Sequence, residues 1–162
     1  MPKTLFALLP AVLLCTGLAQ AGTAVVSFDN ADQYTDVGPR RDAESVQKTL
    51  SGHLQALAER RLPAGQTLAL TITDIDLAGE IPPASRRLHD VRVMGRQPDW
   101  PRISLRYSLQ EGDRVLAQGS DVLSDMAYLM RSTQVHGSGS LPYEQRMLSD
   151  WFDRRFAQPA RH

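Results

Sequence analysis

Aspartates near two predicted strand ends are the residues whose types and spacing best suit chemistry. Asp74 and Asp76 lie two residues apart at the end of one predicted strand, so their side chains point to the same face. Asp121 and Asp125 lie near the end of another. If the two ends are adjacent, these carboxylates would offer oxygen ligands to Ca²⁺ or Mg²⁺, or a general acid and base pair. The interpretation we favour is that they cap turns through local backbone contacts.

Arg92 and the histidines carry weaker indications of chemistry. Arg92 stands between two valines in a short predicted strand. Its guanidinium would clamp an anion in a functional interpretation, but we favour an ion pair with one of those aspartates or a solvent-facing side chain. The histidines, including His53, show no metal-ligand spacing and are all expected at the surface. The loop serines lack a nucleophile-elbow pattern. The sequence therefore predicts no metal site, no cofactor and no catalytic residue.

The aromatic residues divide into two groups by position. Trp151 and Phe152 lie on the apolar stripe of a predicted helix and are expected in the core. Tyr34, Trp100 and Tyr128 come from loops or loop edges, where binding residues concentrate. Together with the polar candidates they form a candidate binding set: Tyr34, Asp74, Asp76, Arg92, Trp100, Asp125 and Tyr128.

Hydrophobic periodicity predicts the elements that must position these residues, in the order β-α-β-β-β-β-α. One helix is predicted over 39–61, and a second follows an N-cap at Ser140 and carries its apolar stripe to Phe156. The strands are predicted over 23–28, 67–77 and 91–94, and in a hairpin over 102–123. We therefore predict an α+β two-layer sandwich, in which a four- to five-stranded, mostly antiparallel sheet carries two helices on one face.

Residues 1–21 are predicted to be a cleaved signal peptide, followed by a single domain over 22–162. Lys3 precedes an apolar stretch from Leu5 to Leu14, and Ala19-Gln20-Ala21 is a small-x-small cleavage pattern. The stretch is shorter than the ~20 residues that span a membrane, so we expect no transmembrane anchor after processing. Cys15 raises the alternative of a lipid anchor, but it lacks a preceding small residue.

The cysteine content and the charge balance of residues 22–162 exclude or disfavour several classes of function. The mature chain would contain no cysteine, which excludes disulfides, thiol catalysis and thiolate metal sites. It would carry 17 basic and 18 acidic residues, because the leader holds one of the 18 basic residues of the whole chain. This near-neutral balance disfavours binding to nucleic acid.

Several strings, of which Thr73–Gly79 is the most specific, resemble the bacterial domain-of-unknown-function family 3016. The likeness extends over about residues 25–156 and implies a small secreted or periplasmic protein of Gram-negative bacteria. It implies no activity, so no functional residue is carried over. The strings that carry it are Tyr34–Asp36, Thr73–Gly79, Val91–Met94, Trp100–Pro101, Ser124–Tyr128 and Met147–Phe152.

These observations together predict a periplasmic, non-enzymatic binding or accessory protein of the cell envelope, whose partner is an envelope protein or ligand. The alternative is a divalent-cation-dependent hydrolase using Asp74, Asp76 and Asp125, which requires these carboxylates within about 5–6 Å of one another. A further alternative is an oligomer in which part of the aromatic set forms the subunit interface.

Overall fold

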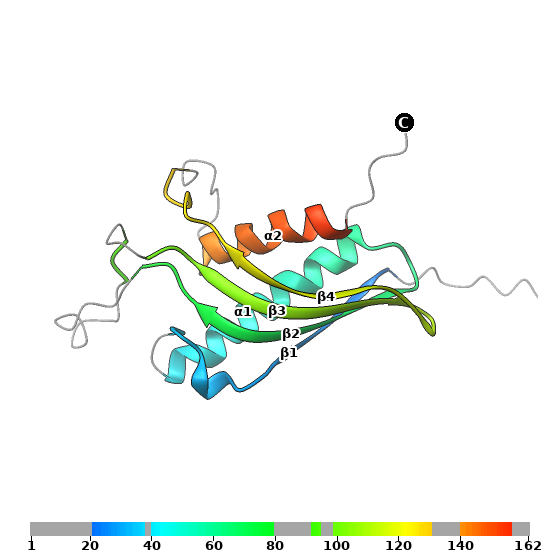
Figure 1. Ribbon diagram of the computed structural model, residues 1–162, viewed down its shortest axis with the longest axis horizontal. Coiled ribbons are helices and arrows are strands. Elements are labelled where there is room, and N and C mark those ends of the chain that lie inside the picture. Colours follow the sequence, from blue (N-terminus) through cyan, green and yellow to red (C-terminus); the bar gives the residue numbers. More distant parts are fainter. Residues whose placement is uncertain (1–20, 38–39, 80–91, 95–98, 131–139, 157–162) are drawn as a thin grey trace, which may run out of the picture.

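The computed structural model describes residues 21–37, 40–79, 92–94, 99–130 and 140–156, so the predicted signal peptide lies outside it except for Ala21. The described chain forms strands, two α-helices and one short 3-10 helix (Figure 1). The elements are β1 (Thr23–Phe28), η1 (Ala31–Gln33), α1 (Arg40–Arg61), β2 (Gln66–Asp76), β3 (Arg102–Glu111), β4 (Arg114–Ser124) and α2 (Pro142–Phe156). All of them except η1, which was not predicted, match their predicted bounds closely.

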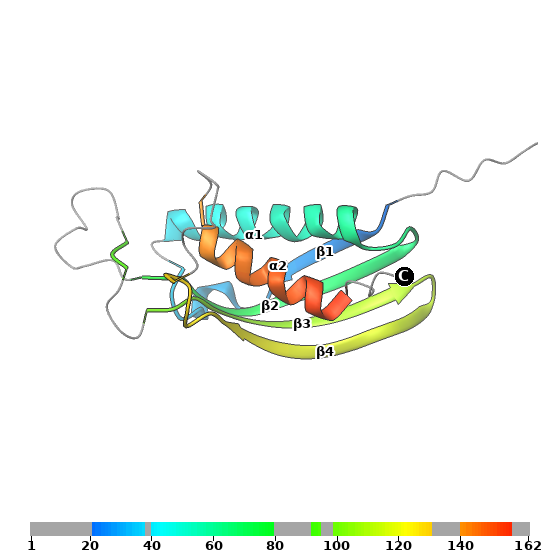
Figure 2. The same cartoon turned by 90° about the horizontal axis from the view of Figure 1, so that it is seen from above.

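The strands form one four-stranded sheet in the order β1-β2-β3-β4. β1 runs parallel to β2 with α1 as the connection between them, and the other two pairs are antiparallel. Both helices cover the same face of the sheet, as the view in Figure 2 shows. The predicted α+β class is therefore confirmed. Of the predicted strand at 91–94, residue 91 lies outside the described residues and Val93 forms only an isolated bridge.

An irregularity in β2 decides which of its side chains face the helices. Ile72 pairs with Leu105, but Asp74 rather than residue 73 pairs with the next residue of β3. Strict alternation would place Ile72 and Ile75 on opposite faces, because they are three residues apart. The extra residue allows both to be fully buried beneath the helices. It also turns Asp74 and Asp76 to the open face, on the same side as each other, as the sequence predicts.

The core lies between the sheet and the two helices. Aromatic rings of α2 pack edge-to-face on Tyr107 of β3, with centroid separations of 5.9 Å for Trp151 and 5.5 Å for Phe156. Trp151 and Phe152 are buried, as predicted. Tyr107 lies over Gly119 of β4, where a Cβ would approach the tyrosine oxygen to 2.9 Å, so a larger residue would displace the ring.

Asp121 lies on the helix-facing side of β4. It accepts hydrogen bonds from Trp151 Nε1 at 2.8 Å and from Arg155 at 2.7 Å. These hydrogen bonds, that of Arg155 above all, hold the pKa of Asp121 below its usual range. β4 also contains a register shift, since Leu109 and Gln110 of β3 pair with Ala117 and Val115. Asp121 thus belongs to the β4–α2 contact.

His53 departs from the expectation that every histidine lies at the surface. It is half-buried where α1 meets α2, and its Nε2 lies 2.8 Å from Ser149 Oγ. The serine hydroxyl in turn donates to the Gln145 carbonyl at 2.9 Å. Burial lowers the pKa of His53, and the charges of Arg60 and Arg61 lower it further. The sequence did not reveal this contact, because the two helices are distant along the chain.

The His53 contact predicts a pH-dependent stability. Because the folded state holds the pKa of His53 below its unfolded value of about 6.5, protonation favours the unfolded chain. We expect the free energy of unfolding to fall as pH drops through about 6.5, and His53→Gln to weaken that dependence. Urea denaturation at pH 7.5 and 5.5 measures both. An unchanged pH dependence in His53→Gln would contradict this assignment.

Candidate functional site

The residues proposed from sequence gather around one end of the sheet, where β2 ends and β3 begins. Asp76 pairs with Arg102 across the strands, and the Asp125 amide donates to the Pro101 carbonyl at 3.3 Å. Around this end the side chains form two groups. One fastens the loop after η1 to β2, and the other supports a turn after β4.

The first group contains Tyr34 and Asp74. Asp74 accepts hydrogen bonds from the Thr35 amide at 2.8 Å and the Thr35 hydroxyl at 2.9 Å. Tyr34 Oη donates to the Ile72 carbonyl at 2.9 Å, and burial, assisted by the charge of Asp29, raises the pKa of Tyr34 to about 12. Asp74 therefore holds the loop at Thr35 against β2, which is a contact between distant segments and not the local turn cap favoured from sequence. A hollow of about 280 Å³ beside this loop is lined by residues 31–32, 34–37 and 43.

Asp76 lies beside this group on the open face of the sheet. Burial raises its pKa, Arg102 opposes this effect, and the charges of Asp36 and Asp74 add to it. The cross-strand neighbour Arg102 supplies the compensating positive charge.

Arg92 binds the protein's own backbone and one carboxylate. Its guanidinium donates to the carbonyls of Leu77 at 3.0 Å, Ala78 at 2.8 Å and Gly79 at 2.6 Å. It also pairs with Asp36, with 2.6 Å between the closest nitrogen and oxygen. An ion pair is the interpretation favoured from sequence, although the partner is Asp36 rather than one of the aspartates weighed there. Arg92 thus fixes the three residues that follow β2.

Gly79 connects this fixed segment to the second group. Its φ is +75°, and a Cβ there would lie 2.6 Å from Met94 Sδ, so no other residue fits without displacement. Its amide donates to the Asp99 carbonyl at 2.9 Å. One residue earlier, the Ala78 amide donates to Glu144 Oε1 of α2 at 2.9 Å. Glu144 is buried, which raises the pKa of its carboxyl.

The second group is built on a buried pair. Tyr128 Oη donates to Asp99 Oδ2 at 2.7 Å, and the two residues are only 3% and 8% exposed. The Tyr128 ring also packs edge-to-face on Tyr143 of α2, with centroids 4.9 Å apart. Asp125 Oδ1 accepts from the Ala127 amide at 3.1 Å and so closes the turn that carries Tyr128.

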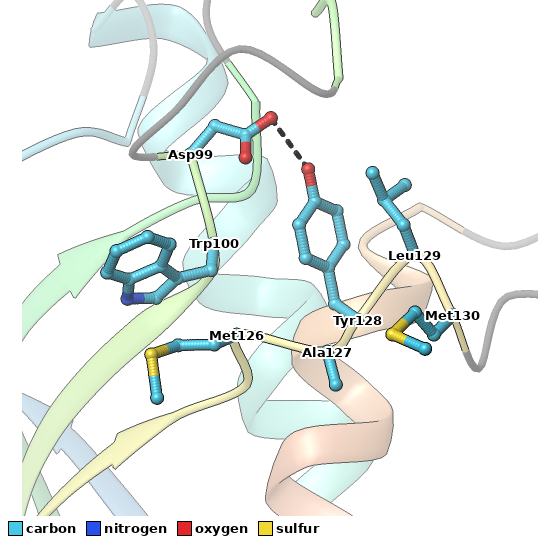
Figure 3. Close-up of a pocket in the computed structure, with 7 residues that line it drawn as sticks. All are labelled: Asp99, Trp100, Met126, Ala127, Tyr128, Leu129 and Met130. Carbon is cyan, nitrogen blue, oxygen red and sulfur yellow. Dashed lines mark hydrogen bonds between the residues drawn. The ribbon is translucent and has the colours of Figure 1, made fainter.

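Apolar side chains project from this supported turn. We call residues 126–130 the methionine turn: Met126 is 73% exposed, Leu129 40% and Met130 86%. Together with half-exposed Trp100 and the Asp99–Tyr128 pair, the turn lines a pocket of about 150 Å³ (Figure 3). Trp100 and Tyr128 are candidates from sequence that the structure brings together.

Asp99, Glu144 and the exposed methionines were not identified from the sequence. An aspartate in a loop and a glutamate in the first turn of a helix are ordinary choices there, so neither residue type signals burial. For the methionines a signal existed, since three large apolar residues within residues 126–130 exceed what a short turn needs.

The described carboxylates do not form the cluster that a divalent-cation site requires. Asp121 faces the helices, whereas Asp74 and Asp76 face the open side of the sheet. Within the part of the chain that the structure describes, no three His, Cys, Asp or Glu residues are grouped to hold a metal ion. The described helices also include none long and apolar enough to cross a membrane.

The fold and site define a small α+β sandwich domain with a supported apolar pocket at one end of its sheet. The family model described as "Protein of unknown function (DUF3016)" matches residues 22–154, and the chain belongs to this family. The resemblance drawn from the sequence is thereby confirmed. Comparisons with curated proteins and with solved structures gave no match.

The hydrogen bonds and ion pair of Arg92 predict that the free energy of unfolding depends strongly on its guanidinium group. We expect Arg92→Lys to lower the free energy of unfolding by about 2–4 kcal/mol, because an ammonium cannot reach all of the carbonyls and the carboxylate, and part-buried acceptors lose their partners. Arg106→Lys is the matched control, since Arg106 forms an exposed ion pair with Asp29 and should change stability by less than about 1 kcal/mol. Equal losses in urea denaturation would contradict the special role of Arg92.

Proposed function

We propose that this protein is an exported, non-enzymatic accessory protein of the cell envelope that binds a partner protein through the methionine turn and Trp100. Export and envelope location rest on the leader-like residues 1–21. The binding role rests on the pocket end of the sheet.

The observation that carries the binding role is the exposure of Met126 and Met130, at 73% and 86%. Apolar side chains so exposed add little to folding, and a gathered patch of them marks an interaction site. Methionine suits such a surface because its unbranched, polarisable thioether adapts to the shape of an apolar partner.

The support beneath the methionine turn favours specific binding. Tyr128 and Asp99 are buried and paired, and Gly79 with Met94 packs against them. A fixed base lowers the conformational entropy lost on association, while the unbranched methionine side chains can adapt to the partner.

The size of the pocket favours a protein partner over a whole small-molecule ligand. Sites for drug-sized ligands have volumes of about 300–1,000 Å³. A pocket of about 150 Å³ accommodates a single side chain. We therefore propose that a partner inserts one anchor side chain between Trp100 and the methionine turn.

The binding surface predicts a double variant that loses its partner without losing stability. Met126→Ser with Met130→Ser should reduce partner recovery from an envelope extract about tenfold or more, because the apolar contacts at the centre of the interface are removed. Its free energy of unfolding should change by less than about 1 kcal/mol, since both side chains are exposed. Quantitative cross-linking and urea denaturation measure the two effects.

The matched control is Val25→Ser with Val115→Ser, which removes apolar side chains of 60% and 50% exposure outside the pocket. The control should recover the partner as the wild type does. Equal recovery by the methionine and valine variants would contradict the proposed surface.

Export predicts a defined N-terminus. When the full chain is produced in a Gram-negative host, mass spectrometry of the periplasmic fraction should find a terminus at Gly22, one residue after the small-x-small pattern. A variant lacking residues 2–21 should stay in the cytoplasm. Recovery of full-length protein with intact Met1 from the cytosol would refute the export proposal.

A further inference from the structure

We propose that the domain crosses the membrane and loses its leader before it folds, because folding buries the bond that the processing peptidase must cut. This inference rests on the proposed function, since the bond is the one between Ala21 and Gly22 that the small-x-small pattern marks. It is carried by the packing of Gly22, by the start of β1 at the next residue and by the composition of the leader.

Gly22 packs against the connection between α1 and β2. It is buried, and a Cβ added to it would overlap the Leu62 Cβ and lie 2.9 Å and 3.0 Å from the carbonyl oxygens of Leu62 and Pro63. These atoms belong to the backbone or are bonded directly to it, so they cannot move aside as the end of a flexible side chain can. Figure 1 and Figure 2 both show the start of β1 beside the end of α1. The bond after Ala21 therefore joins an exposed residue to one that the fold encloses.

No spacer separates this bond from the sheet. Thr23 begins β1 and pairs with Thr67 of β2, and their side-chain hydroxyl oxygens lie 3.3 Å apart. Side chains farther along β1, those of Val26 and Phe28 among them, pack against the core. Proteases cut chain that is exposed and unstructured. To bring Gly22 into an active site, the folded protein must first detach the start of β1 from β2 and α1.

The composition of the leader agrees with export in the unfolded state. Lys3 is the only charged residue among residues 1–21, and this segment contains no arginine. Signals that direct folded proteins across the bacterial membrane carry a pair of arginines. A chain without that pair is carried across unfolded, so the bond after Ala21 is accessible when the chain reaches the peptidase.

The test measures cleavage of the full-length precursor by a purified signal peptidase from a Gram-negative bacterium. The peptidase hydrolyses the bond, so that water supplies the hydroxyl of the new Ala21 carboxyl group and a proton to the Gly22 nitrogen. The folded precursor is compared with the Leu70→Asp precursor, which should not fold because it would bury a charge at a position only 1% exposed. We expect the Leu70→Asp precursor to be cut about tenfold or more faster, since a bond in folded structure is cut only through the open state. Mass spectrometry gives the rate and position of the cut, and circular dichroism confirms which precursor is folded.

A second variant tests whether β1 provides the protection. Phe28→Ala removes a side chain that packs against the core but leaves the residues around the bond unchanged. The folded Phe28→Ala precursor should be cut about threefold or more faster than the folded wild type, because a looser β1 detaches more often. Val122→Ala is the control, since Val122 is 69% exposed on β4, and it should be cut at the wild-type rate.

The outcomes separate this inference from the proposed function. Equal cleavage rates for the folded precursor and the Leu70→Asp precursor overturn the inference and leave export standing. A Phe28→Ala precursor that is cut no faster than the wild type also overturns it, because the protection would then not come from β1. If the Leu70→Asp precursor is not cut between Ala21 and Gly22, the export proposal fails as well.

Discussion

The guanidinium of Arg92 is the constraint on which the pocket end of the molecule depends. After β2 ends, Leu77, Ala78 and Gly79 leave the sheet, and their carbonyls need donors, because buried backbone groups are almost always paired. Arg92 provides these donors, and its charge is balanced by an ion pair with Asp36. The position of this segment then sets the positions of Asp99 and Glu144, which bind its amides. Arg92 thereby connects the segment after β2 to the loop after η1, and that segment in turn contacts α2.

The polar groups at this end illustrate how a small domain supports an exposed apolar turn. Asp99 and Glu144 are buried, yet each accepts a hydrogen bond from a neighbour, so neither is an uncompensated charge. Their hydrogen bonds have defined directions, whereas apolar packing alone does not specify orientation. Tyr128 is thereby held in one place, and the apolar side chains of the methionine turn project from a fixed base.

The sequence predicted the elements well because their apolar periodicity is strong, but it predicted the site only in part. The bulge in β2 was missed, although Ile75 at three residues from Ile72 breaks the alternation and signals it. Trp100 and Tyr128 were placed in the site by their loop positions. Asp99 and Glu144 were not, because their partners lie 29 and 66 residues away and no local pattern encodes such contacts.

The Asp121 side chain affects whether a further strand can pair with β4. β4 is an edge strand, and a further strand added there would have to match its register shift and lie beside the carboxylate held by Trp151 and Arg155. Inward charges and irregular edges of this kind oppose strand addition. The β4 edge of the sheet is therefore a poor template for the addition of a further strand, whether from a second copy of the domain or from another chain.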